Sequence, residues 1–265
     1  MFKLKKSLGQ NFLTDKNIIN KVISLEPLMN QRILEIGPGI GNLTNSIFSK
    51  EPKSLFLIEK DERFFKILKD NYESNNNLKI INGDILNYNL NNIEYSDLIV
   101  FGNLPYNIST QILAKFIKIE KWPPFYKKII FMFQSEVANR ILAKHNTKEF
   151  SRITILANLR LDIVDSFKIS KECFFPIPKV DSKIIVFKPK KKLSFDINKI
   201  ENLEKITQAF FSNKRKMINK TFLKLFKNNL ILAKKLKISL NSRPSELSCE
   251  TYYKMTEHYE ELNNN

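Results

Sequence analysis

The residues of this chain that best suit chemistry are four in a row, Asn103-Leu104-Pro105-Tyr106, which follow an apolar run over residues 97–102. Such a run is typical of a buried strand, so the four residues stand where a pocket can open. The side-chain oxygen of Asn103 and the carbonyl oxygen of Leu104 could both accept from an exocyclic amine. They would favour a pyramidal nitrogen with a localised lone pair, which suits methylation of the amino group of a planar base.

Pro105 and Tyr106 complete this interpretation. Pro105 fixes its own φ and holds the turn rigid, while Tyr106 offers a ring face on which a base can stack. The same four residues would also suit an Asx-type turn followed by a core tyrosine. A cofactor site encoded elsewhere in the chain would favour the first interpretation.

A glycine-rich stretch, Glu35-Ile36-Gly37-Pro38-Gly39-Ile40-Gly41, lies between an expected strand and a helical pattern. Glycines such as Gly37 and Gly39 permit positive φ and let a ligand approach the backbone N–H groups at the start of a helix. Nicotinamide-binding turns favour G-x-G-x-x-G, whereas here the third glycine comes one residue early and an acid precedes the first by two. Glycine-rich turns between a strand and a helix serve several nucleotides, and this spacing favours S-adenosylmethionine among them.

Two further acids end the next expected strands. Glu59 could accept from both ribose hydroxyls of the cofactor, and Asp84, with Ile85 beside it, could accept from the adenine amine. Each acid alone would equally suit a helix N-cap or a surface position. Acids at three successive strand ends predict a cofactor site, because such ends meet at one edge of a parallel sheet.

The N-terminal segment K-K-S-L-G-Q-N-F-L, residues 5–13, could cover this site. A disordered basic arm is the alternative. However, Phe12 and Leu13 need burial, and Gln10 and Asn11 could bond to whatever they cover.

A second covering segment is the loop F-F-P-I-P-K-V-D-S, residues 174–182, which its prolines stiffen. We expect Phe174 at the pocket mouth. A flipped base held between Tyr106 and Phe174 would gain ~1–3 kcal/mol per stacking contact, enough to offset its unstacking.

Apolar runs and helical patterns alternate as far as Phe187, which predicts βαβ units and an α/β fold. We expect a Rossmann-like methyltransferase fold with a mostly parallel seven-stranded sheet and helices on both faces. The last two strands lack a helical pattern between them and should form an antiparallel hairpin at one edge. Strands are expected at residues 32–36, 54–59, 78–81, 97–102, 128–133, 163–169 and 183–187, and helices at 42–49, 62–72, 110–119, 135–142 and 152–159.

The composition changes after Phe187, where K-P-K-K-K over residues 188–192 reads as a linker. Helical spacing without strand signals follows over residues 198–211, 216–226, 230–236 and 250–262. We therefore predict a methyltransferase domain over residues 1–188, with the N-terminal segment 1–13 included, and a small, basic, all-helical RNA-binding domain over residues 193–265.

The charge of the chain predicts a polyanionic partner. The 265 residues carry a formal net charge of +17, and the stretch from Lys183 to Arg243 holds 17 Lys and Arg against three acids. Basic residues in a solvated face are common, but without acids to pair them they repel one another, so phosphates are better partners. The predicted RNA contacts are Lys5, Lys6, Lys214, Arg215, Lys216 and Lys220.

Other classes of site and location are disfavoured. Two cysteines and two histidines without ligand spacing predict no metal. Neither a secretory signal nor an apolar stretch of membrane-spanning length is evident, so we expect a cytoplasmic protein without membrane contact, and a monomer.

Five segments in order resemble the KsgA/RsmA family of small-subunit (16S) rRNA adenine N6,N6-dimethyltransferases. They are K-K-S-L-G-Q-N-F-L, E-I-G-P-G-I-G, N-L-P-Y-N-I-S-T, F-x-P-x-P-K-V-D-S and the basic residues 214–216. The resemblance implies dimethylation of two adjacent adenosines near the 3′ end of that RNA, with S-adenosylhomocysteine as the second product and a role in small-subunit biogenesis. It also implies cofactor contacts from Asn11, Leu13, Gly37, Glu59, Asp84 and Asn103.

Several rival functions fit parts of the pattern. The large-subunit (23S) rRNA adenine methyltransferases of macrolide resistance share the fold, although N-L-P-Y and K-V-D-S favour the small-subunit family. Methylation of DNA adenine or of a protein glutamine would leave the basic domain without a role. A ribosome-assembly factor that acts mainly by binding would tolerate loss of Asn103. The glycine spacing disfavours a nicotinamide dehydrogenase.

Overall fold

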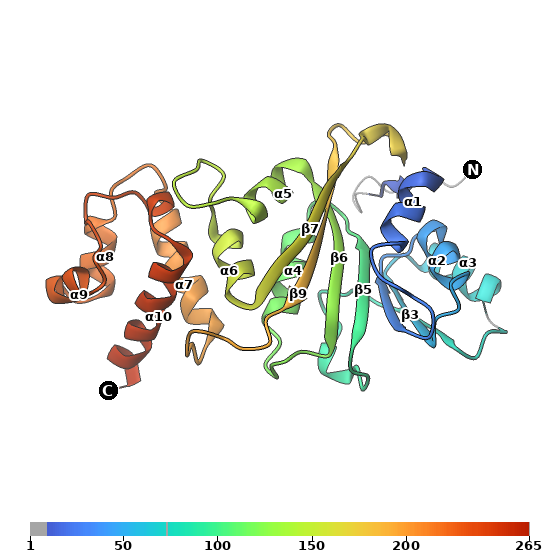
Figure 1. Ribbon diagram of the computed structural model, residues 1–265, viewed down its shortest axis with the longest axis horizontal. Coiled ribbons are helices and arrows are strands. Elements are labelled where there is room, and N and C mark those ends of the chain that lie inside the picture. The colour runs from blue at the N-terminus through green and yellow to red at the C-terminus, as the bar shows by residue number, and fades with distance from the viewer. Residues whose placement is uncertain (1–9, 73, 265) are drawn as a thin grey trace. The chain divides into compact units, whose positions relative to one another are not determined.

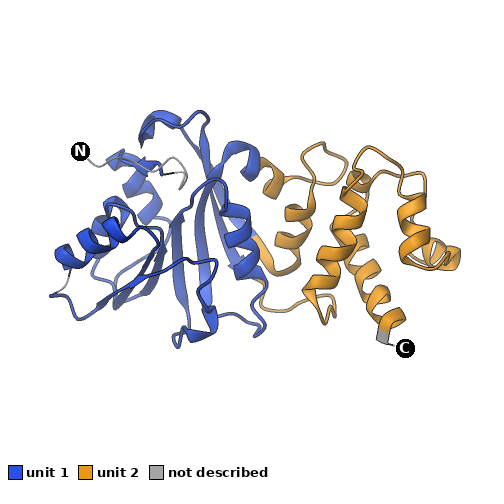
Figure 2. Ribbon diagram, turned by 180° about the vertical axis from the view of Figure 1, so that it is seen from behind, with its two compact units in different colours: residues 1–138, 163–189 blue, residues 139–162, 190–265 orange. Residues whose placement is uncertain are grey.

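The computed structural model describes residues 10–72 and 74–264 (Figure 1). The predicted RNA contacts Lys5 and Lys6 lie outside these residues. The chain forms two compact units (Figure 2). The first runs to Ala138 and resumes over Ile163–Pro189, and the second comprises Asn139–Asp162 and the chain from Lys190 onwards.

The first unit is built on a seven-stranded sheet with the strand order β4-β3-β2-β5-β6-β9-β7. The strands from β4 to β6 pair in parallel, and β9 runs antiparallel to β6. The last two long strands lie side by side at one edge, as expected. The predicted α/β fold with a mostly parallel sheet is confirmed. The strands are β2 (Arg32–Ile36), β3 (Ser54–Glu59), β4 (Leu78–Asn82), β5 (Leu98–Asn103), β6 (Tyr126–Gln134), β7 (Leu161–Ile169) and β9 (Ser182–Pro189).

Helices cover both faces of this sheet because its strands alternate apolar side chains between the two faces. On β6, Met132 joins the core cluster that also contains Ile19 of α1 and Ile47 of α2, whereas Phe131 meets Phe116 of α4 edge-on at 5.6 Å. The helices of this unit are α1 (Lys16–Ile23), α2 (Asn42–Phe48), α3 (Glu62–Tyr72) and α4 (Ser109–Ile117), with α5 (Ser135–Leu142) crossing into the second unit and short 3-10 helices at Leu90–Asn92 and Lys171–Cys173.

A small second sheet ties the N-terminal segment to the loop before β9 (Figure 1). Its two strands are β1 (Phe12–Leu13) and β8 (Phe174–Phe175), which pair antiparallel with Phe12 opposite Phe175 and Leu13 opposite Phe174. Two segments that are far apart in sequence are therefore joined in one two-stranded sheet.

The second unit is helical, as predicted. Its helices are α6 (Arg152–Arg160), α7 (Ile200–Phe211), α8 (Asn219–Leu225), α9 (Leu230–Lys235) and α10 (Cys249–Asn264), with a 3-10 helix at Pro244–Glu246. Helix α6 packs against α7 and α10, and the Tyr253 hydroxyl donates to the carbonyl of Ile155 at 2.7 Å. These contacts group residues 139–162 with the C-terminal helices, although the predicted first domain contained them.

The basic residues 214–216 lie in the turn between α7 and α8 rather than on a helix, which corrects the expected helix over 216–226. The buried Ile218 explains the difference, because its N–H donates to the carbonyl of Ser242 at 2.9 Å instead of continuing α7. In the part of the chain that the structure describes, no helix is both long and apolar enough to cross a membrane.

Candidate active site

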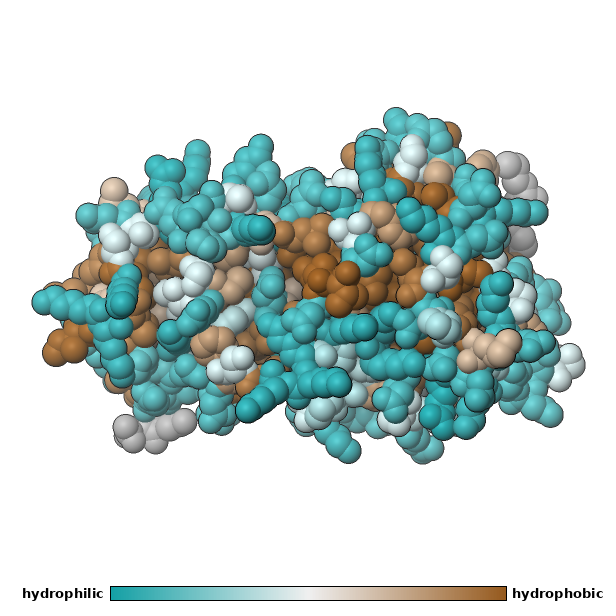
Figure 3. Space-filling view, viewed as in Figure 1, coloured by the Kyte–Doolittle hydropathy of each residue, from teal (hydrophilic) through white to brown (hydrophobic). Residues whose placement is uncertain are grey.

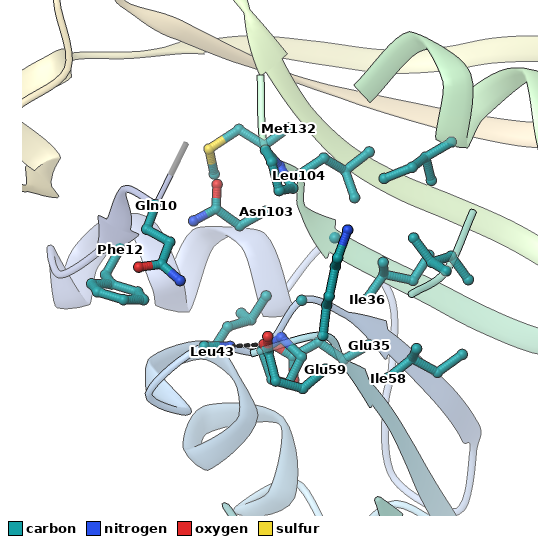
Figure 4. Close-up of a pocket in the computed structure, with 18 of the residues that line it drawn as sticks. Gln10, Phe12, Glu35, Ile36, Leu43, Ile58, Glu59, Asn103, Leu104 and Met132 are labelled. Carbon is teal, nitrogen blue, oxygen red and sulfur yellow. Dashed lines mark hydrogen bonds between the residues drawn. The ribbon is translucent and has the colours of Figure 1, made fainter. Parts of the chain in front are cut away.

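A pocket lies at the carboxyl ends of β2, β3, β4 and β5 (Figure 4). Parallel strands end at one edge of the sheet, so motifs far apart in sequence meet there. The structure brings together the predicted cofactor contacts and the whole N-L-P-Y turn. The predicted residues that line the pocket are Asn11, Leu13, Gly37, Gly39, Glu59, Asp84, Ile85, Asn103, Leu104, Pro105 and Tyr106.

The glycine turn after β2 leaves room for a ligand. Gly37 and Gly39 have φ of +66° and +59°, a conformation that side chains with a Cβ rarely adopt. A Cβ on Gly37 would meet no atom within 4 Å, so the pocket is open beside the backbone there. This open backbone is what close approach of a cofactor needs.

Glu59 ends β3 and holds the glycine turn in place. Its Oε2 accepts from the N–H of Gly39 at 2.9 Å, and its Oε1 accepts from the N–H of Asp61 at 2.7 Å. Burial raises the pKa of Glu59, although the bonds from Asp61 and Gly39 oppose the shift. Each carboxylate oxygen keeps a second acceptor site that could receive a hydroxyl of a bound ligand.

Asp84 follows β4 and is already paired. Lys60 Nζ donates to its Oδ2 at 2.8 Å, and the Leu86 N–H donates to its Oδ1 at 2.9 Å. Partial burial raises the pKa of Asp84, but the bond from Lys60 and that from Leu86 outweigh burial, so the pKa is lowered. A ligand amine that donates a hydrogen bond to Asp84 would share the carboxylate with Lys60, which also lines the pocket.

Glu35, at the end of β2, is the most strongly perturbed acid of the pocket wall. Burial raises its pKa to about 8, the nearby Glu59 adds to the shift, and the hydrogen bond from Thr44 Oγ1 at 2.7 Å opposes it. Glu35 therefore carries a proton near neutral pH, which avoids two adjacent buried negative charges.

Replacement of Glu35 with glutamine should reduce the pH dependence of stability. Between pH 4.5, the ordinary pKa of a glutamate, and pH of about 8, Glu35 is protonated in the folded protein but ionised in the unfolded chain. Wild-type stability therefore falls as the pH rises through this window. The fall should be on the order of a few kcal/mol, and glutamine, which still accepts from Thr44, should escape it. Thermal unfolding across this range measures the effect; equal slopes for both proteins would show that other groups cause it.

The orientation of the Asn103 amide is fixed by the N-terminal segment. Asn103 Nδ2 donates to the carbonyl oxygen of Asn11 at 2.9 Å. Because only the amide nitrogen can donate to a carbonyl, this bond leaves Oδ1 as an acceptor for another group. Figure 4 shows Asn103 beside Met132, its register partner on β6.

Tyr106 is held by a residue of β9. Its hydroxyl lies 2.7 Å from Oγ of Ser182, the fully buried first residue of β9. Burial raises the pKa of Tyr106 and the bond with Ser182 opposes the shift, so the phenol stays neutral. The ring thus has a fixed position in the pocket wall, which is what a stacking partner requires.

Residues 10–13 are bound to the pocket wall at several points. Gln10 Nε2 donates to Oδ2 of Asp61 at 2.9 Å, and Asn42 Nδ2 donates to the carbonyl of Leu13 at 2.8 Å. The Phe12 ring meets Phe64 edge-on at 5.4 Å. For these residues the disordered-arm alternative is wrong, because they form part of the site (Figure 4).

Comparison with known proteins decides the family. The model of the family described as ribosomal RNA adenine dimethylase matches residues 1–261. The chain belongs to this family. A curated relative, ribosomal RNA small subunit methyltransferase A of Pelagibacter ubique (strain HTCC1062), is 43% identical over 260 residues, which cover 98% of each chain. The family expected from the five motifs is confirmed, and the protein is a methyltransferase.

Solved structures agree with this fold. A dimethyladenosine transferase from Plasmodium falciparum matches with a TM-score of 0.78 and 25% identity, covering 95% of this chain and 98% of that one. The 23S rRNA methyltransferase ErmE matches with a TM-score of 0.67 and 20% identity, covering 94% and 99%. The likeness to ErmE shows the fold alone.

Ser182→Ala is expected to slow methylation by this rRNA adenine dimethylase about two- to tenfold, because the ring of Tyr106 loses its anchor. Tyr106→Phe removes the same bond and should have a similar effect. If the bond is the cause, the double variant should be no slower than either single variant. Single-turnover rates with saturating cofactor measure this, and additive losses would assign separate roles to the two hydroxyls.

Phe174 departs from its expected position at the pocket mouth. Its side chain is 2% exposed, belongs to the core cluster with Leu13, and does not line the pocket. Pairing with β1 explains this, because Leu13 and Phe174 are opposite one another and share the core side of the small sheet. A stacking role for Phe174 stays a prediction and would require the ring to leave the core.

The predicted RNA contacts in the second unit differ in exposure. Lys214 is partly buried and its Nζ donates to the carbonyl of Lys148. Burial, and then the charge of Arg140, lower its pKa. Arg215, Lys216 and Lys220 are exposed and are open to phosphate.

The sequence analysis did not assign three residues that the pocket depends on. Asp61 binds Gln10 and also Arg63, and the bond from Arg63 holds the pKa of Asp61 far below its usual range. Lys60 pairs with Asp84, and Ser182 anchors Tyr106. The K-V-D-S motif was the signal for Ser182, whereas nothing local marked Asp61. Among the described residues, no group of three or more His, Cys, Asp or Glu could hold a metal ion.

Proposed function

We propose that this member of the ribosomal RNA adenine dimethylase family dimethylates N6 of two adjacent adenosines in the 3′-terminal hairpin of small-subunit (16S) rRNA, as a monomer in the cytoplasm. The observation that carries the proposal is the Asn103 amide, whose bond to the Asn11 carbonyl leaves an oriented acceptor oxygen at the cofactor pocket. The Pelagibacter relative, named as a small-subunit methyltransferase, supports the choice of substrate.

The cofactor of the proposed reaction is S-adenosylmethionine. The open backbone at Gly37, the carboxylate of Glu59 and the apolar side chains of Ile58 and Ile85 would hold it. When bound, its sulfonium supplies an electrophilic methyl group and leaves as S-adenosylhomocysteine. The chain's own task is therefore to exclude water and to position the acceptor amine, without a covalent nucleophile or a metal.

The N-L-P-Y turn would position the amine. Asn103 Oδ1 and the Leu104 carbonyl would accept from the two N–H groups of N6, which localises the nitrogen lone pair toward the methyl group. Tyr106, held by Ser182, would stack on the adenine ring. The methylated amine is cationic and can release its proton to water. For the second transfer, the monomethylated amine must rotate so that its lone pair again faces the donor.

The basic second unit would hold the RNA. Its exposed Arg215, Lys216 and Lys220 lack nearby acids in the sequence, so phosphates are suitable partners. These exposed charges support residues 193–265 as an RNA-binding domain. The name of the Pelagibacter relative supports the small ribosomal subunit as the partner, with a role in its biogenesis.

The proposal is tested by mass spectrometry of adenosines after incubation with S-adenosylmethionine and unmethylated small subunits, in parallel with large subunits and bare DNA. We expect N6,N6-dimethyladenosine at two neighbouring positions near the 3′ end of the small-subunit RNA. Product in large-subunit RNA alone would assign the protein to the function of ErmE-type enzymes. Tight subunit binding without product would favour an assembly factor.

A further inference from the structure

The loop before β9 exposes apolar side chains beside the active site. Phe175, Ile177 and Val180 are 52%, 62% and 42% exposed, and we call these three residues the loop patch. In Figure 3, hydrophilic side chains surround isolated apolar ones over this loop, near the top of the view. These side chains are outside the core, so a bound partner could cover them.

The pairing of β8 with β1 places Phe175 opposite Phe12, a residue of the pocket wall. Opposite residues of an antiparallel pair project to the same side of the sheet. Leu13 and Phe174 both join the core, so their neighbours Phe12 and Phe175 project to the other side. Phe12 lines the pocket, whereas Phe175 does not and remains half exposed. Phe175 is thus next to the pocket wall but outside the pocket.

The loop is anchored at both ends, so its patch is presented in a fixed position. The Thr14 N–H donates to the carbonyl of Cys173 at 2.9 Å, before the patch. After the patch, Asp181 accepts from the Lys171 N–H at 3.0 Å and forms an ion pair with Lys168 at 2.7 Å. A ligand that covers the patch would therefore order little additional chain.

We propose that Phe175 is a stacking platform for an unpaired nucleotide adjacent to the target adenosine, which rests on the proposed function. Tyr106 is inside the pocket and is assigned to the target base, so a ring just outside it is suited to a neighbouring base. The exposed Lys179, between Ile177 and Val180 in sequence, adds a positive charge suited to the phosphate of that nucleotide. Exposed aromatic rings and positive charges on one surface are typical of single-stranded nucleic-acid sites, and this loop carries one of each.

The test compares wild type with Phe175→Ala, Phe175→Leu and Phe175→Tyr on unmethylated small subunits. We expect Phe175→Ala to raise KM for the subunit about tenfold, the effect of losing one base–aromatic stack, while affinity for S-adenosylhomocysteine stays unchanged. Phe175→Tyr should resemble wild type. Phe175→Leu keeps apolar area but no π face and should resemble Phe175→Ala. Met29→Ala, which removes another exposed apolar side chain of the same unit, is the control.

Four results would overturn the inference. An unchanged KM for Phe175→Ala would show that the ring contacts no RNA, and wild-type behaviour of Phe175→Leu would exclude stacking. Equal losses of subunit and S-adenosylhomocysteine affinity would show that Phe175 acts through the pocket wall. Absence of methylation by the wild-type protein would overturn the proposed function itself, and the inference with it.

Discussion

Asn103→Ala is expected to lower the methylation rate about 100-fold or more, while affinities for S-adenosylhomocysteine and small subunits stay within several-fold. In the proposed mechanism the amide oxygen is a preorganised dipole that acts on the amine as it reacts, and loss of one such group typically costs about 10²–10³ in rate. In the proposed mechanism, ground-state binding rests on other residues, among them Glu59 and the basic second unit. Single-turnover kinetics with saturating subunits isolate the chemical step from binding.

Asn103→Asp separates the two functions of the amide. An aspartate keeps acceptor oxygens but cannot donate to the Asn11 carbonyl, which the wild-type Nδ2 contacts at 2.9 Å. If that bond orients the acceptor, Asn103→Asp should also be slow. Asn91→Ala removes an exposed asparagine side chain of the same unit, away from the pocket, and should react like wild type. Wild-type turnover by Asn103→Ala would refute the role of the amide.

In cells, Asn103→Ala would show whether the protein is needed for methylation or for binding to subunits. If the protein acts mainly by binding assembling subunits, Asn103→Ala should support normal subunit assembly without the modified adenosines. If methylation itself is needed, the variant should resemble a deletion. Subunit profiles and adenosine mass spectrometry of the same cells would distinguish the two.

The sequence predicts the sheet and the pocket well because both depend on local patterns. Short apolar runs separated by helical spacing correspond closely to β2–β6 and α2–α4. The pocket follows without further information, since the glycine turn, Glu59, Asp84 and Asn103 each end or follow a strand, and parallel strands end at one edge. Motifs that stand at strand ends therefore meet whatever the details of packing.

Features that depend on pairing between distant segments could not be predicted in this way. Phe174 and Phe175 are adjacent and chemically identical, and only the register with Phe12 and Leu13 decides which of them is buried. The bond between Tyr106 and Ser182 likewise joins residues 76 positions apart. Similarly, residues 139–162 are grouped with the second unit by packing of α6, and nothing in their own spacing signals that.

Gly39→Ala is expected to weaken cofactor binding at least about tenfold and to slow methylation further. A Cβ at this position would lie 2.6 Å from Cε1 of Phe12, and the backbone φ of +59° is strained for alanine. Phe12 would have to move away from Gly39, which would disturb its edge-on contact with Phe64 and the neighbouring Asn11. The change would therefore disturb two hydrogen bonds. One joins Asn103 Nδ2 to the carbonyl oxygen of Asn11, and the other joins the N–H of Gly39 to Glu59.

Two other glycines of the pocket separate the steric clash from backbone strain. Gly83→Ala has neither, because its nearest neighbour would be the Ile81 side chain at 3.8 Å and its φ is not positive. Gly37→Ala has the strain alone, with φ of +66° and open space around the new methyl. In the ligand-free protein, Gly37→Ala should lose about 1–2 kcal/mol of stability, Gly39→Ala more, and Gly83→Ala little. Equal losses at Gly37 and Gly39 would show that Phe12 yields without cost, and that the N-terminal segment does not depend on contact with the glycine turn.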